Sequence, residues 1–277
     1  MGAANVAALP PVDVLRVGLP TSATRGPGVR VFTGCHPLHA TRGKGMRSTR
    51  QQARFAGLLY ILMCVTGLPG LLLIPNALIV HGDAVATANH LRASPTLLRW
   101  GIASELFHQV VFAYMALALY DLFRSVNRSA ATQLVLLVAL SVPIMFVNTL
   151  NEFAALILVG APPFLATFTR PQLDSLAFLF LRLHGQGIGV VDVFWSLWLV
   201  PFGLLVMRSG FLPRALGVLL LAGAAGAMIG AVTSVLPTLS NSVVDKIGQV
   251  LAQGELPIIV WLVFPGAREP RARTMGA

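Results

Sequence analysis

Six long stretches of apolar residues are the dominant pattern along the chain. They cover residues 55–74, 97–122, 132–158, 188–207, 213–236 and 247–264. Each is near or above the roughly 20 residues that a helix needs to cross a hydrocarbon core about 30 Å thick. Backbone polar groups find no water in lipid, and the alternating pattern of a β-barrel is absent from the sequence. The pattern therefore predicts an all-α integral membrane bundle of six transmembrane helices and excludes a soluble globule.

Two segments between the spans are predicted to be more than turns. Asp83 has the position of an N-cap for a short helix that ends at Ala93, and this helix is expected to lie along the membrane interface on the outer side. An apolar-rich helix is predicted within residues 172–187, but it is too short to cross the membrane alone. Three alternatives stay open for it: a re-entrant helix, a second interfacial helix, or an extension of the fourth span.

Charge is scarce and lies mostly outside the spans. Charged residues make up 11% of the chain, whereas soluble domains carry about a quarter. The net charge of +10 comes from basic residues that flank the spans instead of forming one face, so no nucleic-acid partner is expected. Fifteen of the 20 Lys and Arg residues fall in segments on the same side of the membrane as the N-terminus. The positive-inside rule therefore predicts a multi-pass protein of the cell (inner or plasma) membrane with both termini in the cytoplasm.

The two ends of the chain lie outside the predicted six-span domain, which covers residues 46–265. Residues 1–45 are basic, rich in Gly and Pro, and lack the continuous apolar run of a secretory signal, so a disordered extension is predicted. Met46 is the expected true start, because the cationic segment that begins there abuts the first span. Residues 266–277 are predicted to form a short basic cytoplasmic tail.

Three segments carry a resemblance to a known family. They are Arg54-Phe-Ala-Gly57-Leu-Leu-Tyr60 at the entrance to the first span, Arg124-Ser-Val-Asn-Arg128 in the first cytoplasmic loop, and Arg208-Ser-Gly-Phe-Leu-Pro-Arg214, followed by Ala215-Leu-Gly217-Val-Leu-Leu220, in the second. Together they resemble the bacterial membrane family called domain of unknown function 4386, over roughly residues 50–265. The resemblance implies a multi-pass bacterial membrane protein with no agreed activity, and it carries over no functional residues.

Polar and ionisable side chains inside the spans form the candidate functional site. A charged group costs about 2.5–3.5 kcal/mol at the bilayer centre, so such residues mark ligand or ion pathways by default. The candidates are Glu105, His108, Asn148, Asn151, Glu152, His184, Asp192 and Glu255. Four of them are acids on four separate spans at similar depth. We therefore expect one shared pocket in the outer half of the bilayer that binds or passes a small solute, an ion or a proton.

Other interpretations of the same residues stay open. The Glu105-x-x-His108 spacing is that of di-metal carboxylate bundles, but the second copy that such a centre needs is missing. A single divalent metal is an alternative, held by Glu105, His108, Glu152 and His184, since imidazole and carboxylate suit several such metals. The protein would then be an intramembrane metal-dependent enzyme, and otherwise no cofactor is expected. The third interpretation is a structural or accessory subunit whose acids reach water or pair with one another.

Two further features concern the shape and packing of the spans. Pro143, Pro201 and Pro257 are each expected to bend a span, because proline cannot donate a backbone hydrogen bond. Small residues recur at four-residue steps on one face of the fifth span, namely Ala222, Gly226, Gly230 and Ser234. Such a face lets another backbone approach closely, either within the chain or across a homodimer. Internal packing is favoured because a six-span bundle offers many internal partners, and a homo-oligomer stays an alternative.

Overall fold

The structure of the chain is a computed structural model that describes residues 48–267. Within these residues all regular structure is helical, and six helical segments are long and apolar enough to cross a membrane. Each lies at a position where the sequence predicts a span. The predicted all-α fold class with six membrane-crossing helices is therefore confirmed. The predictions for residues 1–45 and for nearly all of the tail 266–277 lie outside the described residues.

Four of the six spans consist of more than one helical piece. The first is made of α1 (Thr49–Leu68), the π-helical turn η1 (Pro69–Leu73) and α2 (Ile74–Leu78), and the second is α4 (Pro95–Phe123). The third consists of α5 (Arg128–Asn148) and α6 (Leu150–Gly160), and the fourth of α7 (Arg170–Leu197) and α8 (Leu199–Ser209). The fifth is α9 (Arg214–Val235), and the sixth combines α10 (Ser242–Ala252), the 3-10 turn η4 (Gln253–Glu255) and α11 (Leu256–Val263). Outside the spans lie α3 (Ala84–Ala93) and the 3-10 turns η2 (Pro163–Leu165) and η3 (Pro237–Leu239).

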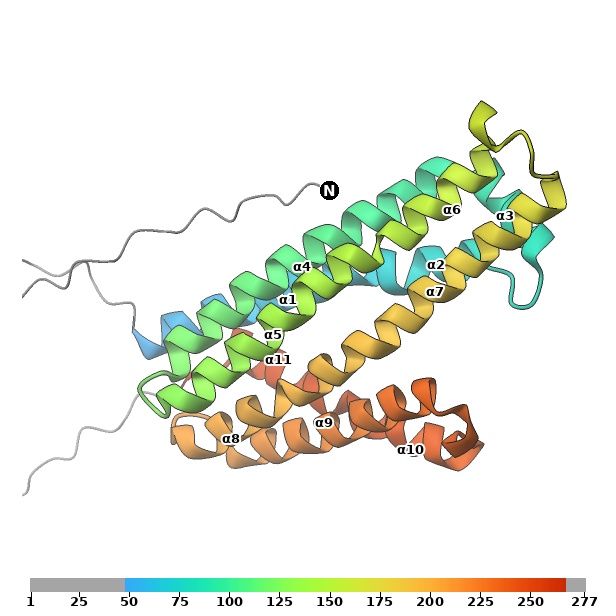
Figure 1. Ribbon diagram of the computed structural model, residues 1–277. Coiled ribbons are helices and arrows are strands. Elements are labelled where there is room, and N and C mark those ends of the chain that lie inside the picture. The colour runs from blue at the N-terminus through green and yellow to red at the C-terminus, as the bar shows by residue number, and fades with distance from the viewer. Residues whose placement is uncertain (1–47, 268–277) are drawn as a thin grey trace, which may run out of the picture. The chain divides into compact units, whose positions relative to one another are not determined.

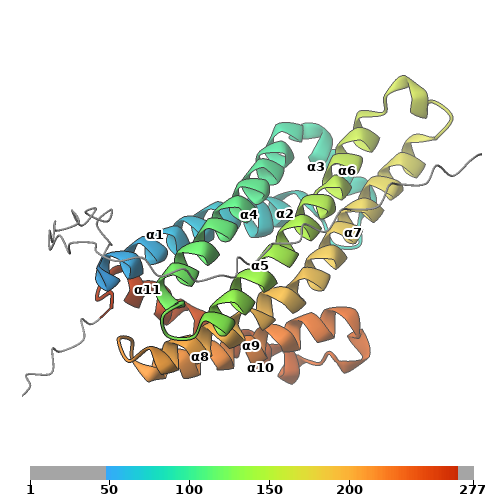
Figure 2. The ribbon, with the colours of Figure 1, turned by 60° about the vertical axis from the view of Figure 1, so that its left-hand side comes forward.

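The spans differ in how far they reach along the bundle. Helix α4 lies against α1 and α5, and α6 lies against α7 (Figure 1). Helices α8, α9, α10 and α11 gather at one end, where α9 contacts both α7 and α10. The first half of α7 extends past the far ends of α9 and α10, toward α3 and α6, and a second view shows the same arrangement (Figure 2). The part of the bundle near α3 is therefore built from fewer helices than the part near α8.

The buried apolar side chains form two clusters at different levels of the bundle. One cluster is rich in aromatic residues, including Trp198 and Phe202, whose stacked rings have centroids 5.5 Å apart. The other brings together α3, α6 and the first halves of α4 and α7. On α4, on the α5–α6 pair and on α7, buried polar residues occupy the positions between the two clusters, and these are Glu105, Glu152 and His184. The fold therefore places a polar layer between two apolar ones.

Helix α7 decides between the alternatives left open for residues 172–187. It runs without interruption from Arg170 to Leu197, so the segment is an extension of the fourth span, and the re-entrant and interfacial alternatives are wrong. Gly187 and Gly189 do not break this helix because each is held against a neighbour. A Cβ atom at Gly187 would overlap the amide of Asn148, and one at Gly189 would meet the Ser234 hydroxyl at 2.5 Å.

The three prolines inside spans have different effects. The fourth span breaks at Trp198, three residues before Pro201, because proline has no N–H to donate to the carbonyl of the preceding turn and its ring clashes with that carbonyl. In the sixth span the 3-10 turn η4 ends at Glu255, just before Pro257, so the expected interruption is present. Helix α5 continues through Pro143 and ends only at Asn148, so this proline does not interrupt the helix, and the bend expected there stays a prediction.

The short helix α3 is tied to α7 at the end of the bundle. It begins at the predicted cap, where the Asp83 carboxylate accepts a hydrogen bond of 2.8 Å from the Ala86 amide. Near its end, Arg92 donates two hydrogen bonds to the carboxylate of Asp174 on α7, at 2.5 and 3.1 Å. These bonds raise the pKa of the Arg92 guanidinium. The stabilisation is therefore fully present below the ordinary pKa of arginine and constant at physiological pH.

We expect an Arg92→Gln variant to lose about 2 kcal/mol of stability. The Asp174 side chain is only 5% exposed and would be left without its cation, while the 26% exposure of Arg92 reduces the loss below that of a fully buried pair. The matched control is Arg124→Gln, because the Arg124–Asp121 pair is more than half exposed on both sides and contributes about 0.5 kcal/mol at most. Denaturant unfolding in detergent measures both. Equal losses in the two variants would contradict a stabilising α3–α7 pair.

Candidate functional site

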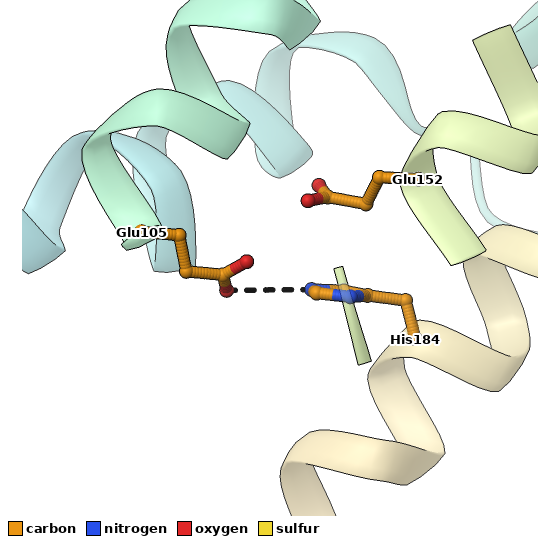
Figure 3. A group of neighbouring side chains, drawn as sticks. All are labelled: Glu105, Glu152 and His184. Atoms are coloured by element: carbon orange, nitrogen blue, oxygen red, sulfur yellow. Dashed lines mark ion pairs between the residues drawn. The ribbon is translucent and has the colours of Figure 1, made fainter. Parts of the chain in front are cut away.

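Three buried side chains from three spans meet in the polar layer. Glu105 comes from α4, Glu152 from the first turn of α6, and His184 from the middle of α7, and they point toward one another (Figure 3). The His184 Nε2 atom lies 3.4 Å from Glu105 Oε1. One ligand atom from each residue lies within 4.8 Å of the other two. Their residues are exposed by only 1%, 2% and 6%, so the group is closed off from solvent.

The π-helical turn in the first span lets Glu105 sit so deeply. Residues 69–73 widen one turn of the helix, and the Ile74 amide donates to the Pro69 carbonyl oxygen five residues back. In this turn Gly70 lies directly on α4, where a Cβ atom would be only 2.6 Å from the Gly101 carbonyl oxygen and 3.2 Å from the Glu105 Cβ. The absence of a side chain at Gly70 thus allows the first span to cover Glu105. Such π-helical turns occur frequently at functional sites.

Asn148 fixes the orientation of His184. The Nδ1 atom of His184 lies 3.3 Å from the Asn148 carbonyl oxygen, which only accepts, so Nδ1 carries a hydrogen and donates it there. In return, the Asn148 amide donates to the His184 carbonyl oxygen at 2.9 Å. Asn151 donates to the side-chain oxygen of Asn148 at 3.1 Å. The two asparagines therefore hold the imidazole so that its Nε2 faces the two carboxylates.

The facing atoms of the three side chains are left without hydrogen bonds. Both carboxylate oxygens of Glu105, one of Glu152 and the Nε2 atom of His184 have no hydrogen-bond partner among the described residues. Burying two carboxylates without compensation is costly, and each unpaired polar atom adds to that cost. With a neutral imidazole and both carboxyl groups ionised, the group would carry a charge of −2, which one divalent cation or two protons would balance. The site is thus built to hold positive charge.

The donor set fits a divalent transition metal. Imidazole nitrogen and carboxylate oxygen are the ligands of zinc, iron and manganese sites, with bonds of about 2.0–2.2 Å. Two such ligands in tetrahedral geometry lie about 3.3 Å apart, close to the 3.4 Å between His184 and Glu105. The hydrogen bond from His184 Nδ1 to a backbone carbonyl is the usual support of a metal-binding histidine. Three protein ligands leave a coordination position for water or substrate, which a metal would activate as a Lewis acid.

His108 lies outside this group, although the sequence analysis places it among the metal ligands. It follows Glu105 by one turn on α4, but its Nδ1 donates to the Met63 carbonyl oxygen of α1 at 2.8 Å, and its ring packs beside Phe112 and Trp195. The histidine thus joins α1 to α4. The Glu105-x-x-His108 motif is not a ligand pair in this geometry, and His184 supplies the imidazole.

Asp192 and Glu255 also lie apart, so the single pocket expected for four acids is wrong. Asp192 follows His184 by about two turns of α7, or about 12 Å along the helix, and lines a cavity of about 470 Å³ between α7, α9 and α10. Glu255 accepts a hydrogen bond from the Tyr60 hydroxyl of α1. Similar depth in separate spans does not fix which way a side chain points. Only Glu105 and Glu152 converge.

Comparison with known families adds a match over most of the chain. The family model described as Domain of unknown function (DUF4386) matches residues 55–266. The chain belongs to this family. No curated protein and no solved structure matches this DUF4386 protein.

The small-residue face of α9 in the DUF4386 protein serves two purposes. Gly226 lies against α10, where a Cβ atom would be 2.5 Å from the Ala252 nitrogen. One turn later, Gly230 has no atom within 4 Å of its Cβ position and, with Ser234, lines the cavity that contains Asp192. Ala222 continues the face toward the start of the helix. This face thus packs internally at Gly226 and borders a cavity at Gly230.

Gln109 is a buried polar residue of the DUF4386 protein that the sequence analysis omits. It is 1% exposed, and neither atom of its amide has a hydrogen-bond partner among the described residues. It follows Glu105 by four residues on α4, so the two side chains share a face. That spacing was visible in the sequence and would have identified it, since an amide in a span is costly unless it is satisfied.

Proposed function

We propose that this protein is an integral membrane protein that binds one divalent transition-metal cation through Glu105, Glu152 and His184. The observation that carries the proposal is the meeting of three buried ligand atoms, without hydrogen bonds, within 4.8 Å of one another. A metal ion would satisfy all three at once and would balance the two carboxylate charges. Side-chain movements that shorten these separations of at most 4.8 Å to the roughly 3.3 Å between neighbouring ligands would complete the ligand set at ordinary bond lengths.

An exchangeable coordination position makes a catalytic role the best-supported use of the metal. Structural metal sites close all four positions with protein ligands, whereas catalytic sites keep one for water or substrate. Here Glu152 and His184 also line a cavity of about 100 Å³, which supplies room beside the metal position. This proposal takes up the metal-dependent enzyme that the sequence left as an alternative, with His184 in place of His108 as the imidazole ligand.

The second candidate function is reversible proton binding by the same three residues, and it is supported by the distance between His184 and Glu105. The 3.4 Å between His184 Nε2 and Glu105 Oε1 suits an ion pair between an imidazolium and a carboxylate. With Glu152 protonated as well, two protons would balance the same charge that a divalent cation balances. The group would then accept and release protons instead of binding a metal.

The site is expected near the outer face of the cell membrane. At 1.5 Å per residue α9 is about 33 Å long, enough to span the hydrocarbon, and His184 lies about 37 Å from Ser209 along α7 and α8. The three side chains therefore lie close to the level at which α9 ends. Because Arg and Lys concentrate at the opposite end, that end is assigned to the cytoplasm. This assignment places the metal near extracytoplasmic substrates.

Metal analysis of the purified protein tests the proposal. We expect the parent protein, dialysed against Zn²⁺, Co²⁺ or Mn²⁺ and freed of excess ion, to retain one equivalent of metal. A Glu105→Gln/Glu152→Gln variant is expected to retain none, because two of its three ligands lose their charge. The matched control is Asp192→Asn, which removes an acid from the same bundle but outside the group and should leave the metal content unchanged.

The outcomes separate the two candidates. A parent that retains no metal, or a double variant that retains as much as the parent, contradicts the metal proposal. If the parent binds no metal but releases protons on a pH jump that the double variant does not show, the proton site replaces it.

A further inference from the structure

Two neighbouring cavities lie between the acid–histidine group and the surface beside α7. The inner cavity, of about 100 Å³, has Glu152 and His184 in its wall. The outer cavity, of about 290 Å³, lies between α7 and the segment after α2. The two cavities share Ile79, Leu181 and Gly185 as lining residues. These three residues therefore stand where the two cavities adjoin, and we call this place the neck.

The walls change in character along this path. Apart from Glu152 and His184, the inner cavity is lined only by aliphatic residues, proline and glycine. The outer cavity adds the polar residues His81, Arg182 and Gln186. Arg182 is exposed and makes no hydrogen bond or ion pair with the other described residues. From the surface inward, the cavities thus offer an arginine without a partner among the described residues, then aliphatic walls, and last the buried acid–histidine group.

We propose that this path admits a small anionic amphiphile, with its phosphate or carboxylate group at Arg182 and a slender apolar portion in the inner cavity. The proposal rests on the proposed function, because it makes the metal position the end of the path. A guanidinium binds phosphate and carboxylate groups with paired hydrogen bonds, which gives the polar group its place. The aliphatic wall of the inner cavity favours an apolar chain over water.

The size of the cavities limits the occupant. The outer cavity is close to the lower end of the range of about 300–1,000 Å³ that small-molecule sites occupy. The inner cavity has room for several chain atoms but not for two acyl chains. Its occupant is therefore a single-chain or short branched amphiphile, or one chain of a larger lipid whose headgroup stays at Arg182. The mouth lies near the membrane face, where such molecules concentrate.

Gly185 offers a clean way to close the path. Nothing lies within 4 Å of the Cβ position of Gly185, so a larger side chain there enters open space and does not clash with a neighbour. Because Gly185 borders both cavities, leucine at this position would fill the neck. Gly160 at the end of α6 has the same open surroundings but borders neither cavity. The Gly160→Leu variant is therefore the matched control for Gly185→Leu.

Binding of octyl phosphate to the metal-loaded protein in nanodiscs tests the proposal, with empty nanodiscs as the background. We expect saturable binding that weakens at least about tenfold in Gly185→Leu, because the chain can no longer enter, and is unchanged in Gly160→Leu. Arg182→Gln should weaken the binding of octyl phosphate about tenfold and leave the binding of octanol unchanged. Arg99→Gln removes another exposed arginine and should change the binding of neither ligand. Inorganic phosphate alone should bind at least about tenfold more weakly, since it lacks the apolar portion.

Two results would contradict the proposed binding path. A change of nanodisc lipid identifies the natural source of the bound molecule. Equal binding of octyl phosphate by Gly185→Leu and the parent, or equal binding of inorganic phosphate and octyl phosphate, contradicts the proposal. If a membrane lipid is the natural source, phosphatidylglycerol in place of a zwitterionic nanodisc lipid should compete with octyl phosphate for the parent protein. If octyl phosphate binding is the same in both lipids, the source is a free amphiphile. Gly185→Leu should retain its metal, so loss of amphiphile binding with full metal content separates this proposal from the metal site itself.

Discussion

A Gly226→Leu variant should lose about 3 kcal/mol or more of its stability, because the added side chain has no room between α9 and α10. A Cβ atom at Gly226 would be 2.5 Å from the Ala252 nitrogen and 2.6 Å from the Gly248 carbonyl oxygen. Both are backbone atoms, so the clash is relieved only by moving a helix. Overpacking of a core costs about 1–3 kcal/mol even when side chains can adjust, and here they cannot.

The matched control is Gly230→Leu, one turn further along the same face of α9. Its Cβ position has no atom within 4 Å, so we expect its stability to change by less than about 1 kcal/mol. Unfolding in mixed detergent micelles, followed by circular dichroism, measures both variants. Light scattering of the two should give the same mass as the parent. A stable Gly226→Leu protein with a changed mass would instead assign this face to a homodimer interface.

The second large effect is expected for Gly187→Ala, which should both destabilise the fold and weaken the metal site. The new Cβ would overlap the Asn148 side-chain amide, so Asn148 must move away from α7. Its side-chain hydrogen bond to the His184 carbonyl oxygen would then be lost, and the Asn148 backbone carbonyl that accepts from His184 Nδ1 would be displaced with it. We expect a loss of about 2–3 kcal/mol in unfolding free energy. Metal affinity should fall about 10- to 100-fold, as when the support of a metal ligand is removed.

Gly185→Ala is the matched control, since it adds the same methyl group two residues away into open space. Helix propensity alone should make it slightly more stable than the parent. Unfolding titrations and equilibrium dialysis with Co²⁺ measure the two variants side by side. If Gly187→Ala binds metal as tightly as Gly185→Ala, the role assigned to Asn148 in orienting His184 is wrong.

The sequence was sufficient for the spans, and the reason is physical. A run of about twenty apolar residues has one stable state in lipid, so six such runs determine six helices without knowledge of their neighbours. The cap at Asp83 is equally local, because it depends only on the next three residues. The extension of the fourth span could not be predicted from local sequence in the same way. Gly185, Gly187 and Gly189 suggest a break, and only the contacts of Gly187 with Asn148 and of Gly189 with Ser234 show why the helix continues.

The candidate site was predictable only in part for a related reason. Hydropathy gives the depth of a side chain, but the rotation of each helix about its own axis decides which side chains meet. Glu105 and Glu152 face the same point, whereas Asp192 and Glu255 at comparable depth face α9 and α1. The choice between the two histidines depends on the same rotation. His108 follows Glu105 on one helix face, but that face also contacts α1. There the Nδ1 atom of His108 donates a hydrogen bond to the Met63 carbonyl oxygen.

The π-helical turn at residues 69–73 makes the helical geometry of the first span, and not only its residue types, part of the site. A π-helical turn holds one residue more than the α-helical turn it replaces, and each residue of an α-helix accounts for about 100° of rotation. If the same residues formed a regular α-helix, everything after this turn would be rotated by nearly that angle. Leu78 and Ile79, which line the cavities, would then face another direction. A homologue with every hydrophobic residue of this span but a regular α-helix at residues 69–73 would thus lack the pocket, whereas the loss of one residue there would leave Leu78 and Ile79 in place.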